Sequence, residues 1–216
     1  MRQHPLTLAG AASFTIDPGA RVLETRVYDR DDLAAWQQGI LEIDLSDGNG
    51  HGTAILSILY DRIQPRLEVE FYLAKILDPG IKGSSLCLLE ALEWLVESAS
   101  PHLINLSLGT TSTALCDPLQ DLVSRAAEQG ITVYASAGAV PSLPAQLTSV
   151  IAVADRGLVP RADPRVKMDQ VVTSETVRLY AQDRWCDVPM STSYACAVAV
   201  AEAARSRFPD ASTRPR

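Results

Sequence analysis

The spacing of apolar and polar residues changes repeatedly along this chain. Short apolar runs alternate with segments in which apolar residues recur at helical intervals. Short apolar runs are typical of strands buried on both faces of a sheet, and they occupy residues 11–17 (AASFTID), 68–77, 102–108, 131–138 and 149–155. Apolar residues recur at helical spacing in residues 51–63, 84–99, 116–130 and 191–208. The third of these segments ends at Gly130, and the fourth is rich in small residues. This alternation predicts an α/β fold, with a mostly parallel sheet and helices on both faces.

Length and composition fit one folded unit. The chain has 216 residues, of which 47% are hydrophobic, and this is enough for a sizeable core. It contains no internal repeat, low-complexity tract or linker. We therefore expect residues 1–216 to form a single domain.

Charge and hydropathy argue against two classes of partner. The net charge is −7 and the sequence pI is about 4.9, so a nucleic-acid role that depends on a basic surface is not expected. No apolar run is long enough to span a membrane, and the N-terminus lacks a secretory pattern.

The cysteines indicate a reducing compartment. They are widely spaced and form no Cys-x-x-Cys pair, so we interpret them as reduced thiols of a cytoplasmic protein. A zinc site shared with the histidines is conceivable, but the positions show no ligand spacing, and we expect neither a metal nor a cofactor. The residues concerned are Cys87, Cys116, Cys186, Cys196, His4, His51 and His102.

Three polar side chains fall where such a fold gathers its site, at the carboxyl ends of strands and the starts of helices. Asp17 ends the first apolar run, His51 begins a helix after a glycine-rich turn, and Ser193 begins another helix. A serine hydroxyl becomes a nucleophile when an imidazole takes its proton, and a carboxylate fixes the tautomer of that imidazole. The chain order Asp, His, Ser is one of those in which this arrangement occurs.

Each of these residues also has an ordinary structural interpretation. Asp17 could be a turn residue at a strand end, His51 a surface histidine in a loop, and Ser193 a helix N-cap. Weaker carboxylate candidates lie in VYDRDD, which resembles a solvated loop: Asp29, Asp31 and Asp32.

Four blocks of this sequence resemble those of the subtilases, the subtilisin-like serine peptidases. SFTIDPG resembles the segment around the family's catalytic aspartate, and DGNGHGT resembles its histidine block. INLSLG is similar to the strand that holds the substrate backbone, and STSYACAVAVAEAA is similar to the serine block. LAKILDPGIKG and the helix through EALEWL also follow the pattern, so the resemblance extends from Ser13 to Phe208. It implies a subtilisin-like α/β fold and a serine endopeptidase.

The resemblance also implies a role for each matching residue. Asp17, His51 and Ser193 would form the catalytic triad, and Ala139, Thr192 and Ser193 would surround the oxyanion. Two segments would bind the substrate, one as a strand that pairs with an extended peptide and one as the opposite wall of the primary specificity pocket. Their residues are Ser107, Leu108 and Gly109 in the first segment, and Ser136, Ala137 and Gly138 in the second.

The sequence departs from the family's pattern at the oxyanion. Subtilases carry a segment AGN whose asparagine donates a side-chain amide to the oxyanion, whereas SAGAV places Ala139 there. Loss of one such donor costs roughly 100- to 1,000-fold in turnover, as known for a subtilisin. The usual glycine before Thr-Ser is Ser191, and the proline that usually follows the serine is missing.

The chain is also small for this family. Few residues precede Asp17 or follow Ser193, and we expect no pro-segment. The connection DRIQPRLEVE is short where many relatives insert a calcium-binding loop, so we expect no tight calcium site there.

A small cytoplasmic subtilase must be harmless to its own cell, which favours slow catalysis with narrow substrate choice. It would resemble the subtilases that remove leader peptides from modified peptides, as in maturation of the small cross-linked subunit of quinohemoprotein amine dehydrogenase. The expected partner is a peptide or protein substrate bound as an extended strand, and partner proteins of a maturation pathway are candidates.

Two other functions stay open at this point. A catalytically weak or dead peptide-binding module would be consistent with Ala139. A nucleotide-binding α/β protein could use the glycines of DGNGHGT to cradle phosphate, but it lacks a P-loop lysine and leaves the other three blocks unexplained.

Overall fold

The computed structural model of the protein describes residues 6–11, 21–27, 49–63, 69–78, 80 and 82–208. Within these residues the chain forms a seven-stranded parallel sheet in the order β2-β3-β1-β4-β5-β6-β7. The strands are β1 (Leu6–Ala11), β2 (Arg21–Val27), β3 (Val69–Lys75), β4 (Leu103–Leu106), β5 (Thr132–Ser136), β6 (Val150–Asp155) and β7 (Gln170–Val172).

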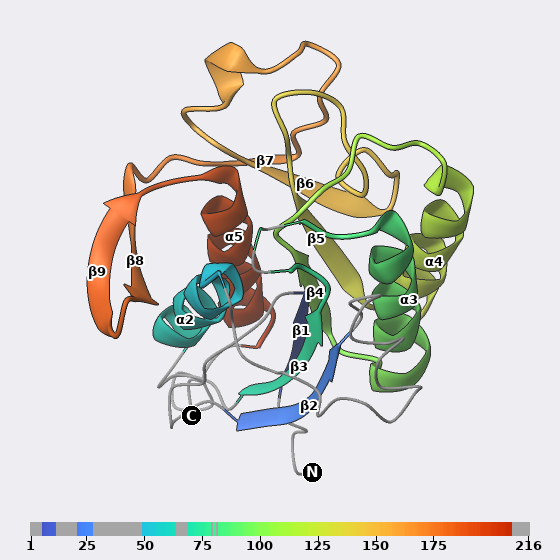
Figure 1. Cartoon of the computed structure of the whole chain (residues 1–216), viewed down its shortest axis with the longest axis horizontal. Helices are drawn as coiled ribbons and strands as arrows, with labels where there is room; N and C mark the ends of the chain where they lie inside the picture. Colours follow the sequence, from blue (N-terminus) through green and yellow to red (C-terminus); the bar gives the residue numbers. More distant parts are fainter. Residues whose placement is uncertain are drawn as a thin grey trace, which may run out of the picture.

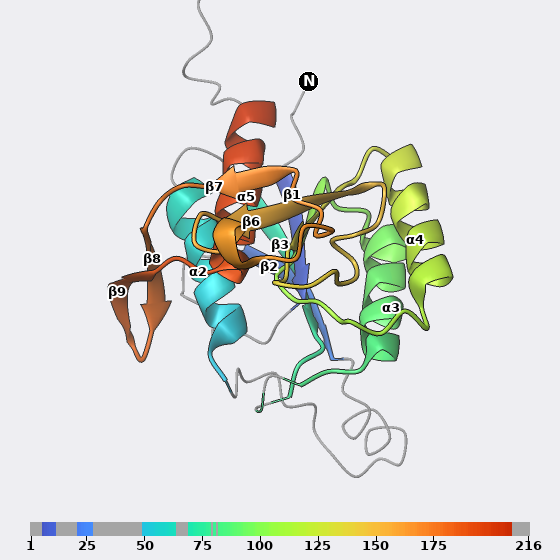
Figure 2. The same ribbon diagram turned by 90° about the horizontal axis from the view of Figure 1, so that it is seen from above.

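Helices cover both faces of this sheet (Figure 1 and Figure 2). One face carries α2 (His51–Ile63) and α5 (Thr192–Arg207). The other carries α3 (Ser85–Trp94), which continues into the π-helical turn η1 (Leu95–Ala99), and α4 (Cys116–Glu128). A short 3-10 helix, η2 (Val159–Arg161), follows β6.

Side chains of the strands alternate between two cores. In β3, Phe71 and Leu73 pack with α2 and α5, whereas Ala74 packs with α3 and α4. In β4, Leu103 joins the first core and Ile104 the second. Burial on both faces explains why these strands appear in the sequence as nearly continuous apolar runs.

Alanines allow α5 to lie inside the first core. Ala195, Ala197, Ala199 and Ala201 are each at most 5% exposed. Their small side chains let the helix backbone approach α2 and the central strands closely, and α5 packs against α2, β4, β5 and β6. This packing holds the beginning of α5 at the carboxyl ends of the strands.

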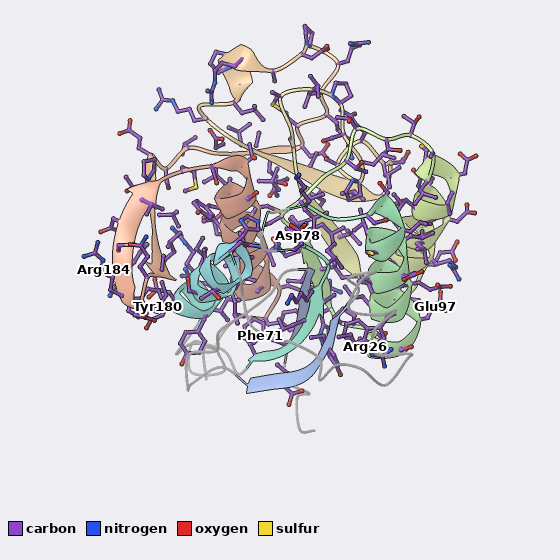
Figure 3. The ribbon with its side chains drawn as sticks, in the orientation of Figure 1. Arg26, Phe71, Asp78, Glu97, Tyr180 and Arg184 are labelled. Carbon is purple, nitrogen blue, oxygen red and sulfur yellow. The ribbon has the colours of Figure 1, made fainter. Side chains whose placement is uncertain are left out.

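A hairpin leads the chain into α5. It consists of β8 (Thr176–Ala181) and β9 (Arg184–Pro189), joined by Gln182 and Asp183, which both have positive φ, as in a type I′ turn. The backbone N–H of Tyr180 donates to Oγ of Ser57 on α2 at 2.8 Å, which fastens the hairpin to that helix. Figure 3 shows Tyr180 beside α2 and Arg184 on the outer side of the hairpin.

The four predicted helices and four of the predicted strands are present, with ends within a few residues of the expected ones. The first strand is an exception: it lies at Leu6–Ala11, where it pairs with Val69–Ala74, and meets the predicted run only at Ala11. Residues 12–17 of that run lie outside the described residues. β2, β7 and the hairpin were not predicted. None of the helices in the described part of the chain is long and apolar enough to cross a membrane.

Candidate active site

His51 is the first residue of α2, at the carboxyl end of the sheet. Oδ1 of Asn49 accepts a hydrogen bond from the backbone N–H of His51 at 2.8 Å, which satisfies one N–H of the first helical turn. Gly50 between them has φ +79°, a conformation that glycine adopts without strain. The glycine-rich turn therefore places the imidazole where the helix begins.

Ser193 is the second residue of α5, directly after the hairpin. Ser191 caps this helix, and its hydroxyl accepts the N–H of Tyr194 at 3.4 Å. Backbone N–H groups in the first turn of a helix have no acceptor within that helix, so they suit a developing oxyanion. Ser193, which the sequence also allowed as the helix N-cap, therefore does not hold that position, because Ser191 does.

The imidazole and the serine hydroxyl meet at one atom, the backbone carbonyl oxygen of Ser107. Nε2 of His51 lies 3.0 Å from this oxygen, and Oγ of Ser193 donates to it at 3.2 Å. Because a carbonyl only accepts, Nε2 carries its hydrogen in this contact. Transfer of the serine proton requires the imidazole to leave this carbonyl and present Nε2 as an acceptor.

A network of hydrogen bonds holds the side chain of Ser107. Its hydroxyl donates to the backbone carbonyl of Ser193 at 2.8 Å and accepts from Nδ2 of Asn105 at 3.0 Å. Ser107 and Asn105 are 3% and 1% exposed. Buried polar groups with satisfied hydrogen bonds fix one arrangement, so this network sets the position of α5 relative to β4.

Cys196 lies one turn beyond Ser193 and contacts the same network. Burial raises the pKa of its thiol to about 12, while hydrogen bonds with Ser107 and the backbone of Leu106 act in the opposite direction. A thiol that stays protonated is neither a nucleophile nor a metal ligand, so Cys196 is not a candidate for either role.

A pocket of about 300 Å³ opens beside His51 and Ser193. The predicted substrate strand, Ser107, Leu108 and Gly109, forms one side of it. The other lining residues come from the end of β3, the start of α3 and the residue after the substrate strand: Ile76, Leu77, Gly83, Ser84, Ser85, Leu88 and Thr110. The lining of the pocket combines apolar side chains with hydroxyl groups.

The second predicted substrate segment lies next to this strand without lining the pocket. Ser136 and Ala137 are 7% and 1% exposed, and Ala137 packs in a small core of its own. A Cβ at Gly138 would lie 3.2 Å from Oγ of Ser142, and a Cβ at Gly109 would lie 3.3 Å from the same atom. The hydroxyl of Ser142 therefore stands between the two segments, whose roles in substrate binding stay predictions.

Ala139 is exposed, and its carbonyl accepts the N–H of Asp163 at 2.8 Å. Its methyl side chain has no donor for an oxyanion. Thr192, the first residue of α5, is half-buried. The oxyanion roles of both residues stay predictions.

The third member of the predicted triad, Asp17, lies outside the described residues, so the triad as a whole stays a prediction. In the ranges that the structure does describe, no three His, Cys, Asp or Glu side chains gather as metal ligands.

Sequence reasoning missed Asn49, Asn105 and Cys196 as parts of this site. Asn49 stands inside the quoted DGNGHGT block, and Asn105 stands two residues before Ser107, a spacing that puts both side chains on one face of a strand. That spacing could have indicated the contact between Asn105 and Ser107. The contact of Cys196 with Ser107, in contrast, depends on how α5 crosses β4.

Solved structures share the fold of this chain. The chain superposes on a cold adapted subtilisin-like serine proteinase with a TM-score of 0.65 at 17% identity, covering 93% of this chain and 76% of that one. It superposes on the prenylagaramide maturation protease PagA with a TM-score of 0.63 at 17% identity, covering 95% of this chain and 79% of that one. The protein therefore has the subtilisin-like α/β fold, which confirms the predicted fold class.

Sequence comparison agrees with the fold. The chain is 34% identical over 120 residues to the minor extracellular protease Epr of Bacillus subtilis (strain 168), covering 50% of this chain and 18% of that protein. It is 27% identical over 135 residues to a cuticle-degrading serine protease of Arthrobotrys oligospora, covering 60% of this chain and 32% of that protein. The alignments thus span about a fifth to a third of these relatives, and no family model matches the chain. The relatives and the structural neighbours together support the subtilisin-like serine protease family.

Proposed function

We propose that this protein is a serine endopeptidase with Asp17, His51 and Ser193 as its catalytic triad. The observation that carries the proposal is the convergence of the His51 imidazole and the Ser193 hydroxyl on the carbonyl of Ser107. These residues come from two helices that are far apart in the sequence, and they meet at the mouth of a pocket.

In the proposed reaction, Oγ of Ser193 attacks the carbonyl carbon of the scissile peptide bond while Nε2 of His51 takes its proton. The N–H of Ser193 stabilises the oxyanion of the tetrahedral intermediate. The imidazolium then protonates the leaving amine, and a water molecule activated by His51 hydrolyses the acyl-enzyme. Asp17 would hold the imidazole in the tautomer that accepts at Nε2.

The substrate would bind as an extended strand along residues 107–109. Its side chain would fill the pocket between this strand and α3, where Ile76, Leu77 and Leu88 favour an apolar group. Hydroxyls of Ser85 and Thr110, which hydrogen-bond each other at 3.3 Å, border the same space.

We further propose a maturation role rather than general degradation. A structural neighbour, PagA, is a maturation protease by name. Ala139, with no donor for the oxyanion, favours slow cleavage of a dedicated substrate. Leader-peptide removal from a modified peptide, or from a subunit of the quinohemoprotein amine dehydrogenase type, is the form we propose. All four cysteines are free thiols, which supports a cytoplasmic location.

A fluorophosphonate probe tests the chemistry. The hydroxyl of Ser193 should displace the fluoride of the probe and become covalently phosphonylated, as judged by mass spectrometry of the labelled peptide. Ser193→Ala and His51→Ala should remove labelling, whereas Ser124→Ala, a substitution on the remote helix α4, should retain it. Labelling at another serine would contradict the assignment.

A second candidate function is a peptide-binding module without turnover. Two observations favour it: the missing donor at Ala139, and the direction of the His51 contact, in which Nε2 donates to Ser107. Folded protein that binds an extended peptide but takes up no fluorophosphonate would establish this alternative.

A further inference from the structure

Asn49 joins the beginning of α2 to a distant loop through one side chain. Its Oδ1 accepts from the backbone N–H of His51 at 2.8 Å, and its Nδ2 donates to the backbone carbonyl of Asp78 at 2.9 Å. The first contact is local, whereas the second connects residues 29 positions apart. One planar amide therefore fixes the two partners relative to each other.

The loop that Asn49 reaches is closed on itself. The N–H of Asp78 donates to the carbonyl of Lys82, and the N–H of Lys82 donates to Oδ1 of Asp78, both at 2.8 Å. Gly83 follows so tightly that a Cβ there would lie 2.6 Å from the carbonyl oxygen of Ile76. The loop is a compact unit, and its position depends on where it is anchored.

The residues on either side of this compact loop form a wall of the pocket beside the candidate site. Ile76, Leu77 and Gly83, which flank the turn, line the same pocket as His51. In Figure 3 Asp78 lies between α2 and α3, the two helices whose first turns border that pocket. Asn49 thus connects His51, the proposed general base, to this wall of the pocket.

We propose that Asn49 is a positioning residue that keeps the imidazole of His51 in register with the pocket wall next to Asp78, formed by Leu77 and Gly83, and hence with a peptide that fills the pocket. This inference rests on the proposed peptidase function. Asparagine suits the role because its side chain offers an acceptor and a donor in fixed geometry. Small misplacements between a bound substrate and a reacting group cost large factors in rate.

Two phosphonate probes separate this role from a general structural one. A small fluorophosphonate reaches Ser193 alone, whereas a tetrapeptidyl diphenyl phosphonate also fills the pocket. Asn49→Ser keeps a short oxygen acceptor for the N–H of His51 and removes the donor to Asp78. We expect the ratio of labelling rates, peptidyl over small probe, to fall roughly 3- to 10-fold, the effect of one neutral hydrogen bond.

Gln120→Ala is the matched control. Oε1 of Gln120 accepts the N–H of Thr148 at 3.1 Å, so it is an amide tether between a helix and a loop away from the pocket. Loss of this hydrogen bond should leave the ratio of labelling rates, peptidyl over small probe, unchanged. An unchanged ratio in Asn49→Ser, or an equal fall for both probes, would overturn the inference.

Hydrogen exchange gives a readout that does not need activity. The amide protons of Asp78 and Lys82 should exchange faster in Asn49→Ser than in the wild type, and at the wild-type rate in Gln120→Ala. Failure of the wild type to take up either probe would refute the peptidase proposal. In that case unchanged exchange in Asn49→Ser would still overturn the coupling, and faster exchange would support it.

Discussion

The hydroxyl of Ser107 donates to the backbone carbonyl of Ser193 at 2.8 Å, and the hydroxyl of Ser193 donates back to the backbone carbonyl of Ser107 at 3.2 Å. The two residues are 86 positions apart in the sequence. Hydrogen bonds in opposite directions fix both the start of α5 and the rotamer of the Ser193 side chain. Ser107 thereby supports the candidate nucleophile, in addition to its predicted place in the substrate strand.

Ser107→Ala should weaken this support. It leaves Nδ2 of the buried Asn105 and the carbonyl of Ser193 without their present partner, at a cost of roughly 1–3 kcal/mol in the free energy of unfolding. Fluorophosphonate labelling of Ser193 should also slow by roughly tenfold, because the nucleophile is less well positioned. Urea denaturation and labelling kinetics measure the two effects. Ser112→Ala, at an exposed position, should change neither, and undiminished labelling in Ser107→Ala would contradict the role.

Ala139→Asn should raise turnover. An asparagine amide could donate to the oxyanion, an interaction made mainly in the transition state, so kcat should rise and KM should change little. The gain should reach up to roughly 100-fold, the size of the effect of one such donor in a subtilisin. Ala139 is exposed, so the larger side chain does not overpack the core.

Single-turnover cleavage of a leader-bearing peptide by both variants measures this gain. No gain with an intact fold would mean that another group already donates, and the hydroxyl of Thr192 is the first to examine. A loss of activity would mean that the site is shaped around alanine.

Cys196 should make the protein less stable in alkali. Burial holds the pKa of its thiol at about 12, above the usual value of 9.0. Between these values the unfolded chain loses the proton and the folded chain keeps it, so rising pH favours unfolding. At pH ~10.5 the loss from this one group should be about 2 kcal/mol.

Urea denaturation at pH ~8 and pH ~10.5 checks this effect, because Cys196→Ala should lose less stability between the two values. Cys116→Ala, which removes a half-buried thiol, serves as the control. An identical alkaline loss in the wild type and Cys196→Ala would contradict the prediction.

Chelation should leave the melting temperature unchanged. A tightly bound ion stabilises the folded state by mass action, so its removal by EDTA would lower the melting temperature. The short connection between α2 and β3 leads us to expect no such ion at that place. A clear drop on chelation, reversed by added calcium, would reveal a site elsewhere.

Helices and central strands were predictable because each has a strong local signal. The helix at His51–Ile63 carries a glycine-rich start and a regular apolar spacing, and its observed ends agree with the predicted ones. Gly130 has φ +78° and ends α4, as its position after the apolar pattern indicates. β3 to β6 are buried on both faces, so their apolar runs stand out.

Edge elements were not predictable in the same way. β2 and β7 are the outermost strands of the sheet, and β7 is largely exposed, so its sequence lacks a long apolar run. The hairpin is stabilised by its contact with α2, and its turn uses Gln182 and Asp183 instead of the glycine that usually marks such a turn.

The residue types of the candidate site could be predicted from the sequence, but the contacts between these residues could not. The blocks around His51 and Ser193 indicate a base and a nucleophile. The shared carbonyl of Ser107 and the tether from Asn49 to Asp78 join positions that are distant in the sequence, and only the tertiary structure brings them together.

The exposed turn at Gln182 and Asp183 lies between the two described members of the proposed triad, His51 and Ser193. A cut there would leave His51 on a long fragment and Ser193 on a short one that begins with β9. The short fragment would carry the alanine-rich surface of α5, which packs against α2 and the central strands without any covalent link. The fold therefore lends itself to a split protein, and under the proposed function two separately made pieces should be labelled at Ser193 only when mixed.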